Sequence, residues 1–216
     1  LRPFECSVLK NSKEKIAVMH LEEKKERLIQ GLAGLHLGMP THLRDCGVSI
    51  DDVKRAYRDA TGDDDRLHIY SHFGSDDPDV ILDTIRFLVT AAGCKYVFLD
   101  HLNMVVSGLQ SDDERKALDY ITSNLEMMVK NLDFSLVEIS HVNDDGLTRG
   151  SRYISKCCDI WIHMERDIDN ESEFVRNITT LRVRKNRPIA RTGPAGKLLF
   201  NPQTFLLSEL DKELPV

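Results

Sequence analysis

Lys95-Tyr-Val-Phe-Leu-Asp100-His101 is the stretch of this chain that decides its fold. The residues from Tyr96 to Leu99 are apolar or aromatic without alternation, which is typical of a strand covered by helices on both faces. Asp100 follows at the carboxyl end of that strand, where open parallel sheets bind their ligands. The stretch therefore predicts a buried parallel strand that presents a carboxylate, a candidate ligand of a nucleotide-bound Mg²⁺.

The bulk composition is that of an ordinary globular protein. The 216 residues are 30% charged and 41% hydrophobic, enough to bury a proper core. The net charge of -6 excludes a surface that is basic all over, although a local basic track for nucleic acid remains open. The five cysteines show no CxxC pair, which argues against a zinc site, and adjacent Cys157 and Cys158 indicate free thiols in a reducing compartment.

Neither a membrane-spanning apolar run nor a secretion signal is present in the sequence. We therefore expect an intracellular protein without a membrane partner.

Strand-like and helix-like segments alternate along much of the chain, which predicts an α/β domain with a mostly parallel sheet flanked by helices. The expected strands are Ile16–Leu21, Leu67–Tyr70, Tyr96–Leu99, Ser135–Ile139, Ile160–Met164 and Thr179–Val183. The expected helices are Glu22–Leu37, Ile50–Thr61, Pro78–Ala92 and Asp113–Leu132. Without repeats or clear linkers, residues 1–216 are interpreted as a single domain.

The C-terminal third has strands with only loops between them. Lys197–Phe200 and Thr204–Leu207 follow Thr179–Val183 directly, and the run from Gly193 to Gly196 is typical of a turn. We expect an antiparallel edge on the sheet, with a hairpin after that turn.

Polar residues follow three other strands at the point where each one ends. Glu22 follows Ile16–Leu21, His141 follows Ser135–Ile139, and the cations Lys185 and Arg187 follow Thr179–Val183. Parallel strand ends converge on one edge of a sheet, so these groups could share a site with Asp100. Triphosphate hydrolysis needs such parts: a carboxylate to orient water, a metal, and cations that stabilise the transferring phosphoryl group.

Taken together, these blocks resemble the motor domain of DnaB-type hexameric replicative helicases, most of all the phage primase–helicases and mitochondrial Twinkle. The resemblance runs from Leu1 to about Leu207 and is carried by HLEE, YVFLDHLNMVVSG followed by DERKALDYI, EISH, RGS with a downstream MER, and RVRKNR…TGPAGKLLFN. It implies a RecA-like P-loop NTPase core that uses ATP and Mg²⁺. It also implies an enzyme that forms a homo-oligomeric ring of six subunits, translocates on single-stranded DNA and unwinds duplex during replication. The same resemblance favours the cytoplasm of a bacterium or phage-infected host over a mitochondrion.

The resemblance implies a catalytic role for three residues at the sheet edge, and each of them also has a purely structural explanation. Glu22 becomes the general base that orients water, although a first-turn carboxylate also stabilises a helix dipole. Asp100 becomes the Mg²⁺ ligand, directly or through water, with His101 beside it; a polar pair at a strand end is the alternative. His141 becomes the γ-phosphate sensor, where a lone histidine is otherwise more often structural.

Four further residues acquire roles near the nucleotide. Lys185 and Arg187 match the pair that reaches a neighbouring subunit's nucleotide, Arg187 being the arginine finger; an ordinary solvated basic run is the alternative. Arg166 and Phe200 match positions beside the nucleotide, with Phe200 as a platform for the base. A core aromatic of a hairpin is an equally ordinary reading of Phe200.

The sequence departs from the family in its phosphate-binding loop, because G-x-x-x-x-G-K-[ST] does not occur in these residues. Leu1–Leu9 is interpreted as the strand before that loop, yet too few residues follow for a crossover to the Ile16 strand. We therefore expect a segment to be missing between about Leu9 and Lys13. The alternative is a true deletion, which would leave no backbone amides to hold phosphates.

A second departure follows His141, where the loop is short and acidic instead of lysine-rich. Either part of this loop is missing too, or Arg149, Arg152 and Lys156 take over the contacts to DNA phosphates.

The sequence leaves two other functions open. One is a RecA-like module without a phosphate loop that binds a helicase or recombinase ring and does not hydrolyse ATP. The other is an unrelated α/β nucleotide enzyme, such as a kinase, which shares only the acid at the strand end.

Overall fold

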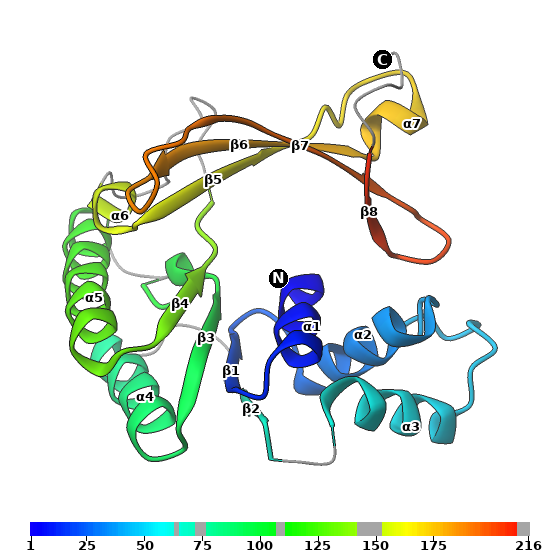
Figure 1. The fold of residues 1–216 in the computed structure, drawn as a ribbon, viewed down its shortest axis with the longest axis horizontal. Coiled ribbons are helices and arrows are strands. Elements are labelled where there is room, and N and C mark those ends of the chain that lie inside the picture. The colour runs from blue at the N-terminus through cyan, green and yellow to red at the C-terminus, as the bar shows by residue number, and fades with distance from the viewer. Residues whose placement is uncertain (63–64, 72–76, 107–110, 142–152, 211–216) are drawn as a thin grey trace.

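The computed structural model describes residues 1–62, 65–71, 77–106, 111–141 and 153–210, which form two four-stranded sheets (Figure 1). The first sheet is parallel in the order β2–β1–β3–β4, with β1 at Lys15–His20, β2 at Leu67–Tyr70, β3 at Cys94–Asp100 and β4 at Ser135–Glu138. The second is antiparallel in chain order, with β5 at Ile160–Glu165, β6 at Ile178–Asn186, β7 at Gly193–Phe200 and β8 at Leu207–Glu209.

Helices cover the parallel sheet on both faces (Figure 1). One face carries α1 (Arg2–Asn11), α2 (Lys25–Leu37) and α3 (Ile50–Thr61), and the other carries α4 (Pro78–Thr90) and α5 (Ser111–Leu132). Short elements complete the described chain: η1 at Leu102–Met104, α6 at Tyr153–Cys157 and α7 at Glu173–Arg176. Within the described residues, no helix is both long enough and apolar enough to span a membrane.

The central strands are apolar without alternation because both of their faces are buried. In β3, Val97 and Leu99 pack into the cluster under α4 and α5, whereas Phe98 packs into the cluster under α1 and α2. All three side chains are fully buried. The predicted α/β class with a parallel sheet flanked by helices is confirmed, and so is an antiparallel C-terminal part. Its strands, β5 included, hydrogen-bond in a sheet of their own.

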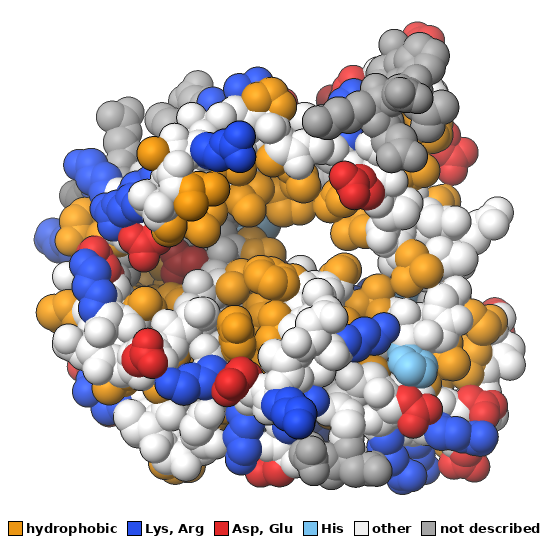
Figure 2. Space-filling model, in the orientation of Figure 1, with side chains coloured by type: hydrophobic (Ala, Val, Ile, Leu, Met, Phe, Trp, Pro, Cys, Tyr) orange, Lys and Arg blue, Asp and Glu red, His pale blue; other side chains and the backbone are white. Residues whose placement is uncertain are grey.

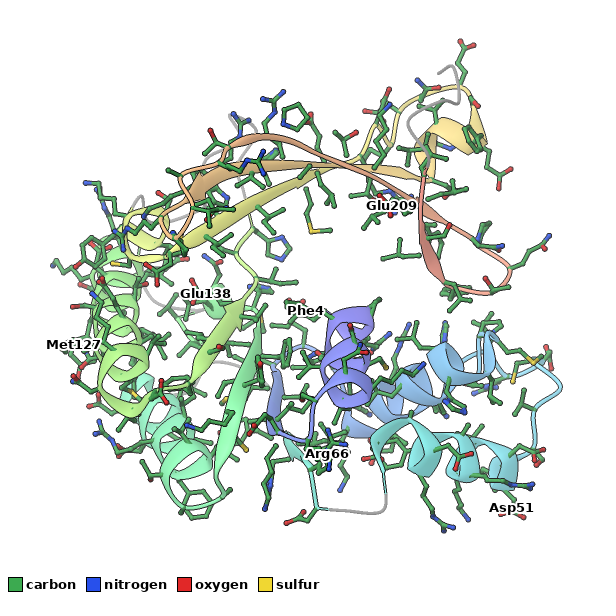
Figure 3. All side chains as sticks on the ribbon, viewed as in Figure 1. Phe4, Asp51, Arg66, Met127, Glu138 and Glu209 are labelled. Carbon is green, nitrogen blue, oxygen red and sulfur yellow. The ribbon has the colours of Figure 1, made fainter. Side chains whose placement is uncertain are left out.

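The strand expected at Leu1–Leu9 is wrong, because these residues belong to the helix α1. Pro3 stands in its first turn, which favours a helix start, and Glu5 and Lys10 lie at the ends where they complement the helix dipole. Arg66, just before β2, donates from Nη2 to the Leu9 carbonyl at 3.0 Å and to a second carbonyl near the end of α1 at 2.7 Å (Figure 3). These bonds satisfy carbonyls that a helix end leaves free.

The expectation of a missing segment between about Leu9 and Lys13 rests on that strand. Because α1 continues through Leu9 to Asn11, the connection to β1 consists of Ser12, Lys13 and Glu14 alone. A connection this short is normal between a helix and a strand. No long crossover is therefore needed at this point. The assignment of residues 1–216 to a single domain remains a prediction.

The turn expected from Gly193 to Gly196 is also wrong. These residues lie in β7, and the chain reverses before them, between β6 and β7. The register shifts where Leu181 opposes Gly196 and Arg182 opposes Pro194, which is a β-bulge. Gly196 has φ of 110°, which explains why a glycine stands there. The later strand begins only at Leu207.

Candidate functional site

The carboxyl ends of β1, β3 and β4 meet at one edge of the parallel sheet. His20 is the register partner of Asp100, and the Leu21 amide donates to the Asp100 carbonyl at 2.7 Å, which extends the β1–β3 pairing by one bond. The Ile139 amide donates to the Leu99 carbonyl at 3.0 Å, which extends the β3–β4 pairing by one bond. Glu22, Asp100 and His141 are therefore brought together as the sequence predicts, although their chemical roles stay proposals.

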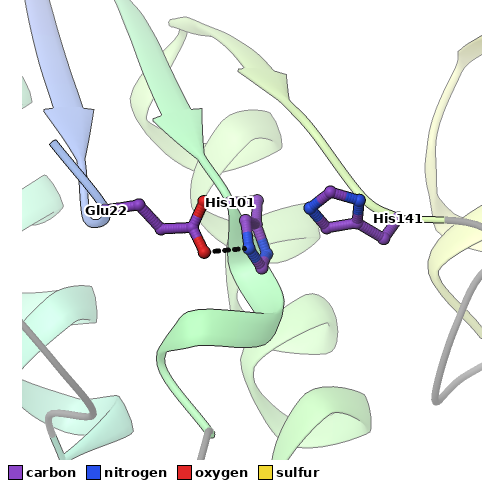
Figure 4. A group of neighbouring side chains, drawn as sticks. All are labelled: Glu22, His101 and His141. Carbon is purple, nitrogen blue, oxygen red and sulfur yellow. Dashed lines mark hydrogen bonds and ion pairs between the residues drawn. The ribbon is translucent and has the colours of Figure 1, made fainter.

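A contact group of Glu22, His101 and His141 lies at this edge (Figure 4). Glu22 Oε1 lies 3.1 Å from His101 Nε2, and the rings of His101 and His141 stand perpendicular with centroids 4.3 Å apart. The His101 side chain is 8% exposed, whereas that of Glu22 is 55% exposed. His101 thus links the carboxylate to His141, a contact that its position beside Asp100 does not reveal in the sequence.

A pocket of about 410 Å³ adjoins the same edge. Glu22 and Asp100 line its inner side with Arg2 at the start of α1, and Phe200 and Phe205 line the side formed by β7 and the turn before β8. Figure 2 shows the opening between the antiparallel sheet and the layer of α1 and α2, with hydrophobic side chains around it. The pocket joins two predicted acids to the predicted base platform, so it can hold a nucleotide-sized ligand.

Aromatic side chains make one wall of the pocket. The Phe200 ring packs edge-on against Phe205 with centroids 5.4 Å apart, and Phe205 packs in the same way on His42 at 4.6 Å. The Arg166 guanidinium lies 6.0 Å from the centre of the Phe200 ring, at the limit of a cation–π contact. Neither Phe205 nor His42 was predicted at the site: Phe205 falls in the expected strand Thr204–Leu207, which begins only at Leu207, and His42 lies in a turn without a periodic signal.

A buried polar network fixes α1 against the end of β1 beside this pocket. His20 Nε2 lies 2.8 Å from an oxygen of the fully buried Glu5, and its Nδ1 lies 3.4 Å from Glu23. Arg2 pairs with the other oxygen of Glu23. The network is not predicted from the sequence, because Arg2 and Glu5 fall in the strand expected at Leu1–Leu9. The helical spacing of buried Cys6 and Leu9 is the signal that could have found it.

The network shifts two pKa values in opposite directions. Burial disfavours the charged His20 ring, but the hydrogen bond and charge of Glu5, with support from Glu23, outweigh it and raise the His20 pKa above its ordinary 6.5. Burial likewise acts against the Glu23 carboxylate, but Arg2 and His20 outweigh it and lower the Glu23 pKa below its ordinary 4.5. Folding therefore favours both charged forms.

We expect stability to depend on pH through His20. A raised folded pKa gives stability that is complete below the unfolded value of about 6.5 and is lost as pH rises through the folded pKa. Urea unfolding of the wild-type chain should therefore give a free energy that falls from pH 6 to pH 9. In His20→Gln that fall should be smaller, whereas the exposed control His36→Gln should keep it. An equal fall in all three proteins would contradict the role of His20.

Lys185 and Arg187 lie away from the pocket of their own chain. The first residue of β6, Ile178, pairs with Leu199 beside Phe200, whereas Arg187 follows the last residue of this nine-residue strand. At the rise of a β-strand the two ends are roughly 27 Å apart. Arg187 donates to the Lys156 carbonyl at 2.7 Å and pairs with Asp159 at 3.1 Å. Neither Lys185 nor Arg187 lines the pocket that Glu22 and Asp100 share with Phe200.

The predicted DNA contacts fall largely on undescribed residues. Arg149 and Arg152 lie outside the residues that the structure describes. Lys156 is exposed in α6, and its carbonyl accepts from both Lys185 Nζ at 2.6 Å and Arg187 Nη2. Lys156 therefore lies beside Lys185 and Arg187 and does not line the pocket.

Comparison with known proteins tests the family assignment. The chain is 28% identical over 214 residues to the DNA helicase/primase of Enterobacteria phage T3, a match that covers 88% of this chain and 36% of the phage protein. The chain is a homologue of phage DNA helicase/primase. It spans about a third of the length of that relative. No family model matches the chain.

Solved structures show the same fold at low sequence identity. An ATPase domain superposes with a TM-score of 0.76 at 19% identity, over 97% of this chain and 80% of the other. A DnaB-like replicative helicase, studied with its interactions with primase, gives 0.70 at 18% identity, over 92% of this chain and 51% of the other. A KaiC-like protein of Pyrococcus horikoshii OT3 gives 0.66 at 15% identity, over 96% and 81%. The chain therefore has the RecA-like fold that these structures share.

Proposed function

We propose that this chain is the motor part of a DNA helicase that hydrolyses ATP or another nucleoside triphosphate. The observation that carries the proposal is the pocket in which Glu22 and Asp100, at the carboxyl edge of the parallel sheet, face the aromatic wall of Phe200. Ligand sites of open α/β sheets lie at this edge. The homology to a phage helicase/primase and the shared fold of a DnaB-like helicase support this reading of the pocket.

The proposed roles follow from the position of each side chain. Glu22, half exposed at the pocket, orients the attacking water and accepts its proton. His141 senses the γ-phosphate, and its ring contact with His101 connects it to Glu22. Phe200 offers its face to the base, and Arg166 lies beside that ring.

The Asp100 carboxylate suits the Mg²⁺ that accompanies nucleotides. It lines the pocket at the end of β3, and carboxylate oxygen is a ligand type that Mg²⁺ prefers. When bound there, directly or through water, Mg²⁺ neutralises charge on the phosphates. The phosphate-cradling motif G-x-x-x-x-G-K-[ST] does not occur in these residues, so the proposal assigns them no such contact.

Assembly into a ring explains the placement of Lys185 and Arg187. Because they do not line the pocket of their own chain and lie at the end of β6 away from Phe200, they serve the nucleotide of a neighbouring subunit in the proposed hexamer. Arg149, Arg152 and Lys156 contact single-stranded DNA in this proposal, which needs basic charge only in the channel and so agrees with the net charge of -6. The phage relative supports a place in the cytoplasm of an infected bacterium.

The alternative of a docking module that does not hydrolyse ATP is less well supported. A module of that kind has no need for a carboxylate, two imidazoles and a strand-end acid at one sheet edge beside a pocket. The relative is, moreover, a helicase/primase.

Nucleotide binding tests the pocket directly. We expect Phe200→Leu to weaken binding of a fluorescent ATP analogue about 10-fold, because stacking of a base on an aromatic ring contributes about 1–3 kcal/mol. The measurement is fluorescence anisotropy with the gene product that contains these residues. Phe87→Leu, at an exposed position on α4, should bind as the wild type does. Equal affinity in Phe200→Leu and wild type would remove Phe200 from the base site.

A further inference from the structure

We propose that Glu22, His101 and His141 form a binding site for a first-row transition-metal ion such as Zn²⁺, separate from the Mg²⁺ position at Asp100. One ligand atom from each residue lies within 4.8 Å of the others (Figure 4). A carboxylate and two imidazoles are a known Zn²⁺ ligand set, and three protein ligands leave one coordination position open.

The distances require only a modest closure around an ion. Zn²⁺ binds nitrogen and oxygen at about 2.0–2.2 Å, so tetrahedral ligand atoms stand about 3.3 Å from one another. Glu22 Oε1 and His101 Nε2, at 3.1 Å, already meet that spacing. Glu22 and His141 are exposed and can shift by a change of rotamer, whereas His101 is buried and provides the fixed ligand.

The backbone and the burial of His101 hold the site in place. The Leu102 amide donates to the Ile139 carbonyl at 3.3 Å, which ties the residue after His101 to the strand end before His141. The His101 side chain is more than nine-tenths buried, and its Nδ1 has no hydrogen-bond partner among the described residues. The other ring nitrogen, Nε2, faces Glu22 Oε1 at 3.1 Å and is the atom through which His101 would bind the ion.

The chemistry of the ligands separates this ion from Mg²⁺. Mg²⁺ prefers oxygen and keeps most of its water, whereas imidazole nitrogen favours Zn²⁺, Co²⁺, Ni²⁺ and Cu²⁺. Two of the three ligands here are imidazoles. Physiological Mg²⁺ therefore does not compete effectively for this group.

Occupancy of the site would inhibit hydrolysis, an inference that rests on the proposed function. Glu22 bound to a metal cannot accept a proton from water, and His141 bound to the same ion cannot respond to a phosphate. Low concentrations of Zn²⁺ should inhibit hydrolysis in the presence of excess Mg²⁺, and a chelator should restore it.

Metal binding is tested on the tag-free chain without nucleotide. Co²⁺ is titrated and its visible absorption is followed, because a tetrahedral nitrogen–oxygen site gives intense bands; calorimetry with Zn²⁺ gives the affinity. We expect saturable binding that weakens at least 10-fold in His141→Ala and in Glu22→Gln, the scale on which changes around a metal site act. His36→Ala, which removes another exposed histidine, should bind as the wild type does.

The cysteines provide the second control, since thiols also bind Zn²⁺. The double variant Cys157→Ser/Cys158→Ser should retain binding. The proposal is overturned if binding is not saturable, if His141→Ala binds as tightly as wild type with an unchanged circular dichroism spectrum, or if the double cysteine variant loses the ion. Binding with the expected variant pattern but no nucleotide hydrolysis would support the metal site and contradict the helicase motor.

Discussion

Glu22→Gln should lower nucleotide hydrolysis by about 10²- to 10⁴-fold, the range that a positioned general base contributes. The substitution keeps the shape of the side chain and removes its ability to accept a proton from water. Because Glu22 is half exposed, folding should be unaffected. The measurement is phosphate release by the gene product that contains these residues, at saturating ATP and Mg²⁺.

Glu26→Gln is the matched control for this change. Glu26 lies in the first turn of α2, is exposed and does not line the pocket. The Glu26→Gln variant should hydrolyse ATP at the wild-type rate. Affinity for ATP should also be retained in Glu22→Gln, since an interaction made mainly in the transition state affects kcat more than binding. Hydrolysis within about threefold of wild type in Glu22→Gln would place the base elsewhere.

Arg187→Ala should lower DNA-stimulated hydrolysis by about 10³-fold, the scale found for arginines that act on a neighbouring subunit's phosphates. ATP affinity of the single subunit should change little, because Arg187 lies at the far end of β6 from the pocket of its own chain. Its pair with Asp159 is exposed, so the loss of stability should stay below about 1 kcal/mol. Arg184→Ala, an exposed arginine on the same strand, is the matched control.

Mixed rings separate action between subunits from action within one. Arg187→Ala subunits mixed with Glu22→Gln subunits should recover part of the activity, because some interfaces then pair an intact arginine with an intact base. Rings made of either variant alone should show no recovery of hydrolysis. If no mixing ratio restores hydrolysis and the protein stays monomeric with nucleotide and DNA, the result would favour a docking module that does not hydrolyse ATP over a ring-forming motor.

The α/β class could be predicted from the sequence because it depends on local patterns. Tyr96–Leu99 is apolar without alternation since both faces of β3 are buried, and α5 carries its apolar stripe at helical spacing against α4. The convergence of Glu22, Asp100 and His141 follows as well, since parallel neighbours place their carboxyl ends at one edge. These features need no knowledge of distant contacts.

Distant contacts decided the remaining features. Leu1–Leu9 has a composition open to either a strand or a helix, and it becomes α1 where Arg66 satisfies its last carbonyls and Glu5 meets His20. Lys185 has no acid near it in sequence, yet its ammonium donates to the Ser155 and Lys156 carbonyls of α6. Local sequence therefore determined which elements form and which strand ends are polar. Only the tertiary structure decided which buried groups pair, because their partners are tens of residues apart and become neighbours through packing.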